Sequence, residues 1–359
     1  MLDTSPSALS HVRRKQDHLR IAVQEAVSAT GISSGLGPQL LTHCALPELD
    51  LAEIDTGTRM LDRQLCVPFL ISGMTGGFAE GAEVNRRLAV AAQTVGCAMG
   101  VGSQRVAIEH PERAVHFRVR DVAPDVLLLA NLGAVQLNYG YGIDECRRAV
   151  EMIEADALVL HLNPLQEALQ TGGNTNWSGL LRRIETVCAL LPVPVVVKEV
   201  GWGISGEVAR RLAEAGVAAI DVGGAGGTSW SEVERHRAGN ETMARVCATF
   251  NGWGIPTADA VQTVRAAVPA IPVVASGGLR TGIDAASAIA LGADLAGFAG
   301  AVLQAATESA EAATALLSAL ATELRICMFC CGARRLHALR RDDFAGAGVG
   351  VSAGTVGLP

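Results

Sequence analysis

Short apolar runs, rich in leucine and β-branched residues, alternate with Ala-, Glu- and Arg-rich stretches from about residue 65 onward. Runs of this length and composition predict buried strands. The eight predicted strands are 67–72, 97–101, 126–131, 157–163, 194–200, 218–223, 271–276 and 295–299. A helical stretch follows each one, as is typical of parallel strands covered by helices. The pattern therefore predicts an α/β protein with a closed (β/α)₈ barrel, the TIM-barrel architecture.

The alternative for such alternation is a Rossmann sheet, which needs a G-x-G-x-x-G turn after its first strand. The turn after 67–72 reads SGMTGG and does not supply one. We expect an N-terminal helical arm and capping segment at 1–64, the barrel at 65–343, and a flexible Gly-rich tail at 344–359. The Gly-rich stretch 224–256 is expected to be a long active-site loop.

Composition narrows the classes of function. A hydrophobic content of 49% with 18% charged residues indicates a substantial core, and the formal charge of -7 disfavours non-specific nucleic-acid binding. The first twenty residues are charged and lack the apolar segment of a secretory signal. No uncharged apolar run reaches about 18 residues. We expect a soluble, cytoplasmic protein that binds neither nucleic acid nor membrane.

Three of the nine cysteines fall in the segment CMFCC, at Cys327, Cys330 and Cys331. A zinc site would need a fourth ligand, for which His337 is the nearby candidate. The alternative, which we favour, is a helix face within an apolar segment.

Polar side chains or glycines follow nearly every predicted strand, at the end where barrels of this type carry their chemistry. They are Ser72 to Gly77, Gly102 to Arg105, Asn131, His161, Asn163, Lys198, Glu199, Gly223 to Thr228, Ser276 to Gly278, and Ala299 with Gly300. Turn chemistry explains one or two of these positions but not all of them. The set predicts a functional site on this face of the barrel.

Glycine-rich turns after the seventh and eighth strands predict a phosphate cradle, with Arg280 and Thr228 nearby. Lys198 is either a lysine that reaches the barrel rim or a cation facing an electron-rich ring. Together with Asn131, Ser103 and the backbone of 74–76, the second interpretation suits FMN.

A second anion site is suggested by Arg14, Lys15 and His18, with Arg105 at the end of another strand. A solvated helix face is the alternative for the first three. Glu167 could hold Mg²⁺ through a substrate diphosphate, because this ion seldom uses an all-protein cage.

The segment HLNPLQE, residues 161–167, has a structural interpretation as well. Asn163 can cap a helix that begins at Pro164, with Gln166 completing a capping box. Strand parity places His161 and Asn163 on the same face as Val159, so both can point into the barrel mouth.

The chain resembles the type 2 isopentenyl-diphosphate isomerases. The resemblance rests on Arg14-Lys15-x-x-His18, SGMTGG, GSQR, NLGA, HLNPLQE, KEVG, DVGGAGGTSW, WGIPT, SGGLRTG and GFAG, in this order between about residues 12 and 340. It implies a homo-oligomer, a tetramer or octamer, that interconverts isopentenyl and dimethylallyl diphosphate. It also implies reduced FMN as acid/base catalyst, Mg²⁺ as the ion that holds the diphosphate, and NAD(P)H as reductant.

The resemblance further implies roles for individual residues. Gln166 and His161 would be catalytic, and Glu167 would bind Mg²⁺. The substrate-binding residues would be Arg14, Lys15, Ser103, Gln104, Arg105, Asn163 and Gln166. The FMN-binding residues would be Gly73, Met74, Thr75, Gly76, Ser103, Asn131, Lys198, Thr228, Gly277, Gly278, Leu279, Arg280, Ala299 and Gly300.

Two other functions use similar parts. An FMN-dependent 2-hydroxy-acid oxidase shares barrel and cradle, but it needs a His base with arginines that clamp a carboxylate beside the flavin. A flavin-binding sensor or scaffold would need neither Glu167 beside Gln166 nor a separate basic arm.

Overall fold

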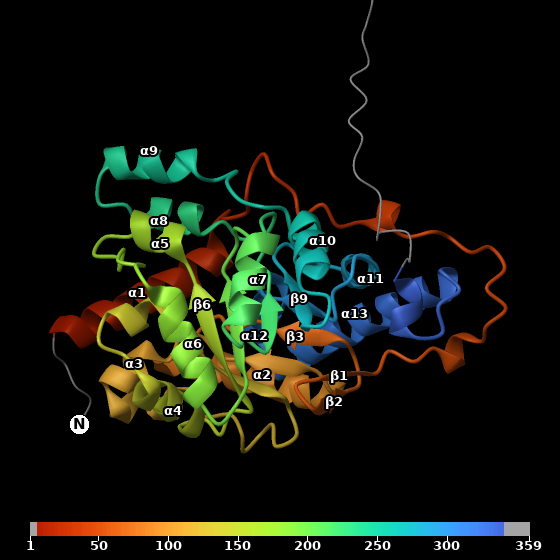
Figure 1. Ribbon diagram of the computed structural model, residues 1–359, viewed down its shortest axis with the longest axis horizontal. Helices are drawn as coiled ribbons and strands as arrows, with labels where there is room; N and C mark the ends of the chain where they lie inside the picture. The colour runs from red at the N-terminus through yellow and green to blue at the C-terminus, as the bar shows by residue number, and fades with distance from the viewer. Residues whose placement is uncertain (1–5, 341–359) are drawn as a thin grey trace, which may run out of the picture.

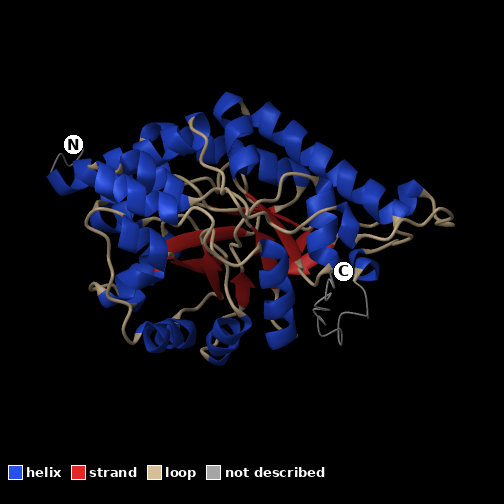
Figure 2. Cartoon of the chain, turned by 90° about the horizontal axis from the view of Figure 1, so that it is seen from above, coloured by secondary structure: helices blue, strands red, loops and turns tan. Residues whose placement is uncertain are grey.

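Eight parallel strands close into a barrel ringed by helices in the computed structural model, which describes residues 6–340 (Figures 1 and 2). The strands are β3 (Phe69–Ile71), β4 (Ala98–Gly100), β5 (Leu128–Gly133), β6 (Ala157–Leu162), β7 (Val195–Glu199), β8 (Ala219–Asp221), β9 (Val273–Ser276) and β10 (Leu295–Phe298). Neighbours in sequence are neighbours in space, and β10 pairs with β3 to close the ring. The (β/α)₈ prediction is confirmed, and the predicted tail at 344–359 lies outside the described residues.

Helices surround the barrel, and among them α2, α4, α10 and α11 contact its strands directly. They are α2 (Ala79–Val95), α3 (Arg105–Glu109), α4 (Ile143–Glu151), α5 (Pro164–Leu169), α6 (Leu180–Leu190), α7 (Gly206–Glu214), α8 (Trp230–Arg237), α9 (Glu241–Thr249), α10 (Thr257–Ala267), α11 (Gly282–Ala290), α12 (Gly300–Glu308) and α13 (Ala310–Cys330). Short 3₁₀ turns are η1 (Pro38–Leu40), η2 (Leu51–Glu53), η3 (Pro111–His116), η4 (Ala134–Asn138) and η5 (Leu336–Leu339).

The stretch 224–256 is not the long loop that its glycines suggested, because α8 and α9 occupy much of it. The Asn240 side chain caps α9 by accepting a hydrogen bond from the Met243 N–H. In α8 the side chains of Ser231, Glu232, Val233 and Glu234 are all buried. Burial of this polar helix against its neighbours therefore overrides a local sequence that reads as a loop.

Among the described helices, α13 is the one long and apolar enough to cross a membrane by length and composition. It packs against α2, α11 and α12 through a buried stripe that includes Leu317, Leu320 and Leu324. Its last turn carries Cys327 and Cys330, and Cys331 caps it. The three cysteines therefore lie at the end of a helix, and the described residues contain no group of three or more His, Cys, Asp or Glu side chains placed to hold a metal ion.

Inside the barrel an apolar layer is followed by a polar one. The apolar cluster comprises Leu70, Ala98, Leu127, Leu129, Ala157, Val159, Val196, Ala219, Val274 and Leu295, with Met60 and Leu65. Because side chains alternate along a strand, the next inward position lies two residues further on. These positions are Ser72, Gly100, Asn131, His161, Lys198, Asp221, Ser276 and Gly297. The floor of the barrel mouth is thus polar or open on every strand.

The N-terminal segment covers both ends of the barrel. Helix α1 (Pro6–Gln24) contacts α3, α8 and α12 at the carboxyl ends of the strands. The hairpin of β1 (Thr58–Met60) and β2 (Arg63–Leu65) closes the opposite end, where Met60 and Leu65 join the apolar cluster. Figure 1 shows α1 and the hairpin on opposite sides of the barrel.

Two arginine–aspartate clamps fasten the amino ends of the strands. Asp156 binds Arg120 and accepts the Leu128 N–H at the start of β5. Asp294 does the same for β9: its carboxylate binds Arg265 at 2.5 Å and accepts the Val273 N–H at 2.8 Å. Each clamp joins the loop before one strand to the first residue of its neighbour.

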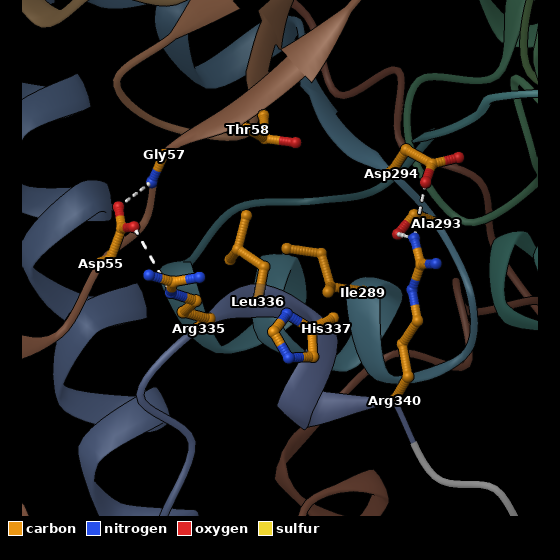
Figure 3. Close-up of a pocket in the computed structure, with 10 residues that line it drawn as sticks. All are labelled: Asp55, Gly57, Thr58, Ile289, Ala293, Asp294, Arg335, Leu336, His337 and Arg340. Carbon is orange, nitrogen blue, oxygen red and sulfur yellow. Dashed lines mark hydrogen bonds and ion pairs between the residues drawn. The ribbon is translucent and has the colours of Figure 1, made fainter.

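Beside the Asp294 clamp lies a pocket of about 270 Å³ (Figure 3). Its apolar base includes Ile289 and Leu336, and the pair of Asp294 with Arg340 borders it at 2.5 Å. This pocket lies at the amino ends of the strands, away from the face where barrels of this type carry their chemistry. Its ion pair ties η5 to the barrel.

We predict that Asp294→Ala lowers the free energy of unfolding by about 2–3 kcal/mol, because it removes the carboxylate that two guanidinium groups and one backbone N–H share. Urea unfolding measures the change. Asp121→Ala is the control: Asp121 pairs with Arg86 at 2.9 Å on the surface, where its side chain is 63% exposed. The control should cost less than about 1 kcal/mol. Equal losses in the two variants would contradict the clamp.

Candidate active site

The barrel mouth brings together predicted residues from three adjacent strands. His161 on β6 is in register with Lys198 on β7, and the His161 Nδ1 lies 2.8 Å from the Asn131 Oδ1 on β5. An amide oxygen only accepts hydrogen bonds, so the proton sits on Nδ1 and the lone pair on Nε2. Asn131 thereby fixes one tautomer of His161.

Gln104 does not contact the mouth as the substrate-binding expectation required. It is fully buried, its Nε2 donates to the Ala149 carbonyl at 2.8 Å, and its Oε1 accepts the Asn131 N–H at 2.8 Å. Both ends of the amide are bonded to backbone. Gln104 therefore supports β5, and with it the Asn131–His161 pair.

His161 is neutral at physiological pH. Burial lowers its pKa to about 4, with further lowering from the nearby charges of Lys198 and Lys15. A histidine in this state can accept a hydrogen bond at Nε2, but it is a weak base near pH 7.

The HLNPLQE segment forms a locked cluster of amides and a carboxylate. Helix α5 begins at Pro164 after Asn163, as predicted, but the capping box is absent. Asn163 instead donates its Nδ2 to Gln166 Oε1 at 3.0 Å and to Glu167 Oε1 at 3.1 Å. Glu167 Oε2 also accepts from Gln170 Nε2 and from the Asn174 N–H, each at 2.6 Å. Glu167 is therefore held in one orientation at the edge of the mouth.

Two cations of α1 lie close enough to the mouth to interact with its charged groups. Lys15 Nζ donates to the carbonyls of Gly76 at 3.0 Å and Ser103 at 2.5 Å, and it lies 5.0 Å from the centre of the Phe117 ring. Burial, with the neighbouring Arg14 charge, lowers the pKa of Lys15 to about 7. Burial also lowers the pKa of Arg14, and Arg105 adds to this effect. Cations that lie close together, and whose charged forms are disfavoured by burial and by each other, indicate a binding site for an anion.

Arg105 at the start of α3 links the cations to α5. Its Nε binds Glu109 Oε1 at 2.8 Å, and one terminal nitrogen donates to the Asn174 side chain at 3.1 Å. The Asn174 backbone N–H is bonded to Glu167. The predicted anion-binding arginine and the predicted metal ligand thus share one loop residue.

Helix α8 contributes residues that the sequence analysis did not name. Glu234 Oε1 lies 3.1 Å from His18 Nε2, and Glu234 Oε2 accepts from Arg237 at 2.7 Å. The Trp230 ring packs edge-on against His18 at 5.1 Å. Burial raises the pKa of Glu234, but His18 and Arg237 outweigh it and bring the pKa below its usual value. The signal in the sequence was the four-residue spacing of Trp230 and Glu234, which places both side chains on one face of a helix.

The glycine turns of β8 and β9 pack backbone against backbone. Gly277 has φ +107°, and a Cβ there would collide with the Gly224 carbonyl. Thr228 Oγ1 lies 3.8 Å from the place of a Cβ on Gly300, where α12 begins without a side-chain cap. Uncapped helix N–H groups beside a hydroxyl and close-packed glycines fit a phosphate.

Three buried side-chain oxygens of the mouth have neither a hydrogen-bond partner nor an ion-pair partner in the described part of the chain. They are Ser72 Oγ, Thr75 Oγ1 and Asn163 Oδ1. Buried polar groups normally have partners, so these atoms indicate a polar ligand. The phosphate cradle and these atoms together fit FMN. Glu167, as a single carboxylate, fits an Mg²⁺ ion that takes its other ligands from a substrate and water.

The comparisons with known proteins point the same way. Residues 155–345 match the FMN-dependent dehydrogenase family. The chain is 55% identical to the isopentenyl-diphosphate delta-isomerase of Stutzerimonas stutzeri, over 93% of this chain and 97% of the relative. For the protein of the same name from Nostoc, the identity is 52%, over 94% and 97%. A solved structure of mandelate oxidase superposes with a TM-score of 0.60 at 21% identity, over 94% and 98%, and shows the fold.

A low pKa of His161 makes stability depend on pH. The pKa of about 4 in the folded protein lies below the unfolded value of about 6.5. The folded state therefore binds fewer protons, and stability is lost as pH falls from about 6.5 toward 4. His161→Asn lacks this titration. We predict that its free energy of unfolding, compared with that of the wild type, rises by about 2 kcal/mol when the pH is lowered from 7 to 5. Urea unfolding at both pH values measures it. His43→Asn, at an exposed position, is the control, and an equal gain there would contradict the assignment.

Proposed function

The chain belongs to the isopentenyl-diphosphate delta-isomerases and matches the FMN-dependent dehydrogenase family, and from this we propose how its barrel mouth works. The reaction is the interconversion of isopentenyl and dimethylallyl diphosphate. The observation that carries the assignment is identity of about half of all residues over nearly the full length of both chains. The geometry of the mouth supports a diphosphate substrate, an Mg²⁺ ion and FMN.

The diphosphate end is assigned to the cations of α1 and α3. Arg14, Lys15 and Arg105 would bind the phosphate oxygens, with Ser103 beside them. Glu167 would hold Mg²⁺ against the same group, since its orientation is fixed by Asn163, Gln170 and Asn174. Glu234 and His18 are further candidates for this end, because the pKa of Arg14 responds to Glu234 and Glu167.

FMN is assigned to the strand ends and the glycine turns. The phosphate would lie at Thr228, Gly277 to Arg280, and Ala299 with Gly300, and the ring would lie near Gly73 to Gly76, Ser103, Asn131 and Lys198. When bound in reduced form, FMN supplies proton transfer at its ring without net redox change. NAD(P)H is the proposed reductant that keeps the flavin reduced.

The chain's own residues orient the carbon skeleton and keep water away. The reaction adds a proton at one terminal carbon and removes one from the carbon next to the diphosphate-bearing one. Glu167 is engaged with amides and the proposed metal, and His161 is neutral with a pKa of about 4. Gln166 would lie against the skeleton, and His161 Nε2 would accept a hydrogen bond. The apolar interior below would shield a cationic transition state.

A 2-hydroxy-acid oxidase is less well supported by this mouth. Such an enzyme needs a basic histidine, whereas the pKa of His161 is lowered to about 4 and its Nδ1 is bonded to Asn131. The arginines gather on α1, α3 and α8, where they suit a diphosphate better than a carboxylate beside the flavin. The expected tetramer or octamer and the cytoplasmic location stay predictions from the sequence and the resemblance.

We predict that the protein, kept anaerobic with reduced FMN, Mg²⁺ and isopentenyl diphosphate, yields dimethylallyl diphosphate. Product analysis by mass and nuclear magnetic resonance reads the result, and no product would refute the function.

Glu167→Gln should lower the rate at least about 10-fold and weaken the Mg²⁺ dependence, while the flavin stays bound. Glu109→Gln, a matched change on α3, should keep the Mg²⁺ dependence. If Glu167→Gln instead lost flavin, the metal assignment would be wrong.

Binding of a diphosphate should take up a proton at Lys15. With a pKa of about 7, Lys15 is mostly uncharged at pH 8, and a bound anion favours its charged form. Calorimetry in two buffers of different ionisation enthalpy should therefore show an uptake approaching one proton at pH 8 and much less at pH 6. In Lys15→Arg the uptake should vanish, because a guanidinium is always charged. Unchanged uptake in that variant would rule out Lys15 as the group that titrates.

A further inference from the structure

The sequence contains only two lysines, Lys15 and Lys198, among 29 basic residues, and both lie in the barrel mouth. Every other basic side chain of the Lys and Arg class is therefore an arginine. Arginine stays charged at any ordinary pH, whereas a buried lysine changes its charge with its surroundings. The two amines in this protein that can switch charge are thus both at the proposed active site.

Asp221 is the carboxylate that faces Lys198. It lies on β8 in register with Lys198 on β7, and Asp221 Oδ2 is 3.9 Å from Lys198 Nζ. Its other oxygen, Oδ1, accepts from Ser276 Oγ at 2.5 Å and from the Gly223 N–H at 3.3 Å. Asp221 is 1% exposed, and Oδ2 has no hydrogen-bond partner in the described chain. Ser276 therefore holds one oxygen of Asp221 and leaves the other directed at the lysine.

The other titratable groups near Lys198 are already committed. Glu199 follows it on β7, but Glu199 Oε2 accepts the backbone N–H groups of four successive residues, Val200, Gly201, Trp202 and Gly203. His161 on β6 is neutral and bonded to Asn131. Lys198 Nζ also donates to the Glu199 carbonyl. Among the described residues, Asp221 is the carboxylate with an oxygen within 4 Å of the Lys198 ammonium.

We propose that Asp221 is a positioning residue of the isomerase, which keeps Lys198 charged and directed into the mouth. The inference deepens the proposed function, because it concerns the cation that would lie against the flavin ring. A reduced flavin is electron-rich, and a fixed ammonium beside it is useful only while it keeps its proton.

The energetics of burial explain why a dedicated partner is needed. Burial disfavours the ammonium, and an opposite charge within about 4–6 Å restores it by about 1–3 pH units. The pair is mutual: burial raises the pKa of Asp221 above its usual value, and Lys198 and the Ser276 hydroxyl offset part of that rise. Neither charge would be favourable in the mouth without the other.

The scarcity of lysine provides a direct experiment. Protein grown with lysine labelled with ¹³C at Cε should show two lysine signals, and Lys15→Arg assigns the one that remains to Lys198. In the FMN-free wild type, the Lys198 signal should shift at a higher pH than the Lys15 signal. In Asp221→Asn, the pH midpoint of the Lys198 signal should fall by about 1–3 units. The Lys15 signal serves as an internal reference and should move by less than about 0.3 units.

Two variants separate charge from packing. Ser276→Ala removes the hydrogen bond to Asp221 but keeps the carboxylate, so the Lys198 midpoint should move by less than about one third of the Asp221→Asn shift. Asp121→Asn makes the same charge change on the surface and should move neither lysine. The alkaline limb of the isomerase rate should shift down in pH together with the Lys198 signal in Asp221→Asn.

Two results would overturn the inference. One is an unchanged Lys198 midpoint in Asp221→Asn. The other, which needs no folded variant at position 221, is a wild-type Lys198 signal that shifts at a lower pH than Lys15. A protein that makes no dimethylallyl diphosphate but shows the expected lysine titrations would refute the proposed function and leave the Asp221–Lys198 pairing standing.

Discussion

The two-residue period of a strand is the constraint on which the rest of the structure depends. Each of the eight strands turns alternate side chains inward, and the barrel is too narrow to leave these positions empty. One inward layer is apolar and stabilises the fold through burial. The next layer carries Asn131, His161, Lys198 and Asp221, so the polar groups of the mouth stand on a packed base. The apolar layer that stabilises the fold and the polar layer of the mouth are therefore about 7 Å apart along each strand.

Charge is distributed unevenly between the two ends of the barrel. At the amino ends, Asp156 and Asp294 each bind arginine side chains and a strand N–H, so the charges there are matched. At the mouth, Lys15 is bonded to carbonyls only, and Asn163 Oδ1 has no hydrogen-bond partner in the described part of the chain. Unmatched groups cost free energy in the folded state. A ligand that pairs with these groups recovers this cost on binding. The matched charges at the amino ends of the strands stabilise the fold while the groups of the mouth remain unpaired.

Much of the fold could be predicted from the sequence because buried parallel strands are continuous apolar runs. All eight predicted ranges overlap an observed strand, and seven of them contain it entirely. Parity along β6 also placed His161 correctly. The prediction was wrong where tertiary contacts decide: α8 forms in a Gly-rich stretch because Glu232 and Glu234 are buried against neighbouring elements. For the same reason the role of Gln104 could not be predicted, because its side-chain amide forms hydrogen bonds with the backbone of β5 and α4.

The pairing of Asp221 with Lys198 could not be predicted from the sequence. Within the run AAIDVGG it could be an ordinary strand-end carboxylate, and only the register of β8 with β7 places it opposite Lys198. Ser276 comes from a third strand and holds the carboxylate from the far side. Three strands separated by more than fifty residues in places thus determine the charge of one amine. A site built this way forms only when β7, β8 and β9 pair in register, and its charge state follows from that register.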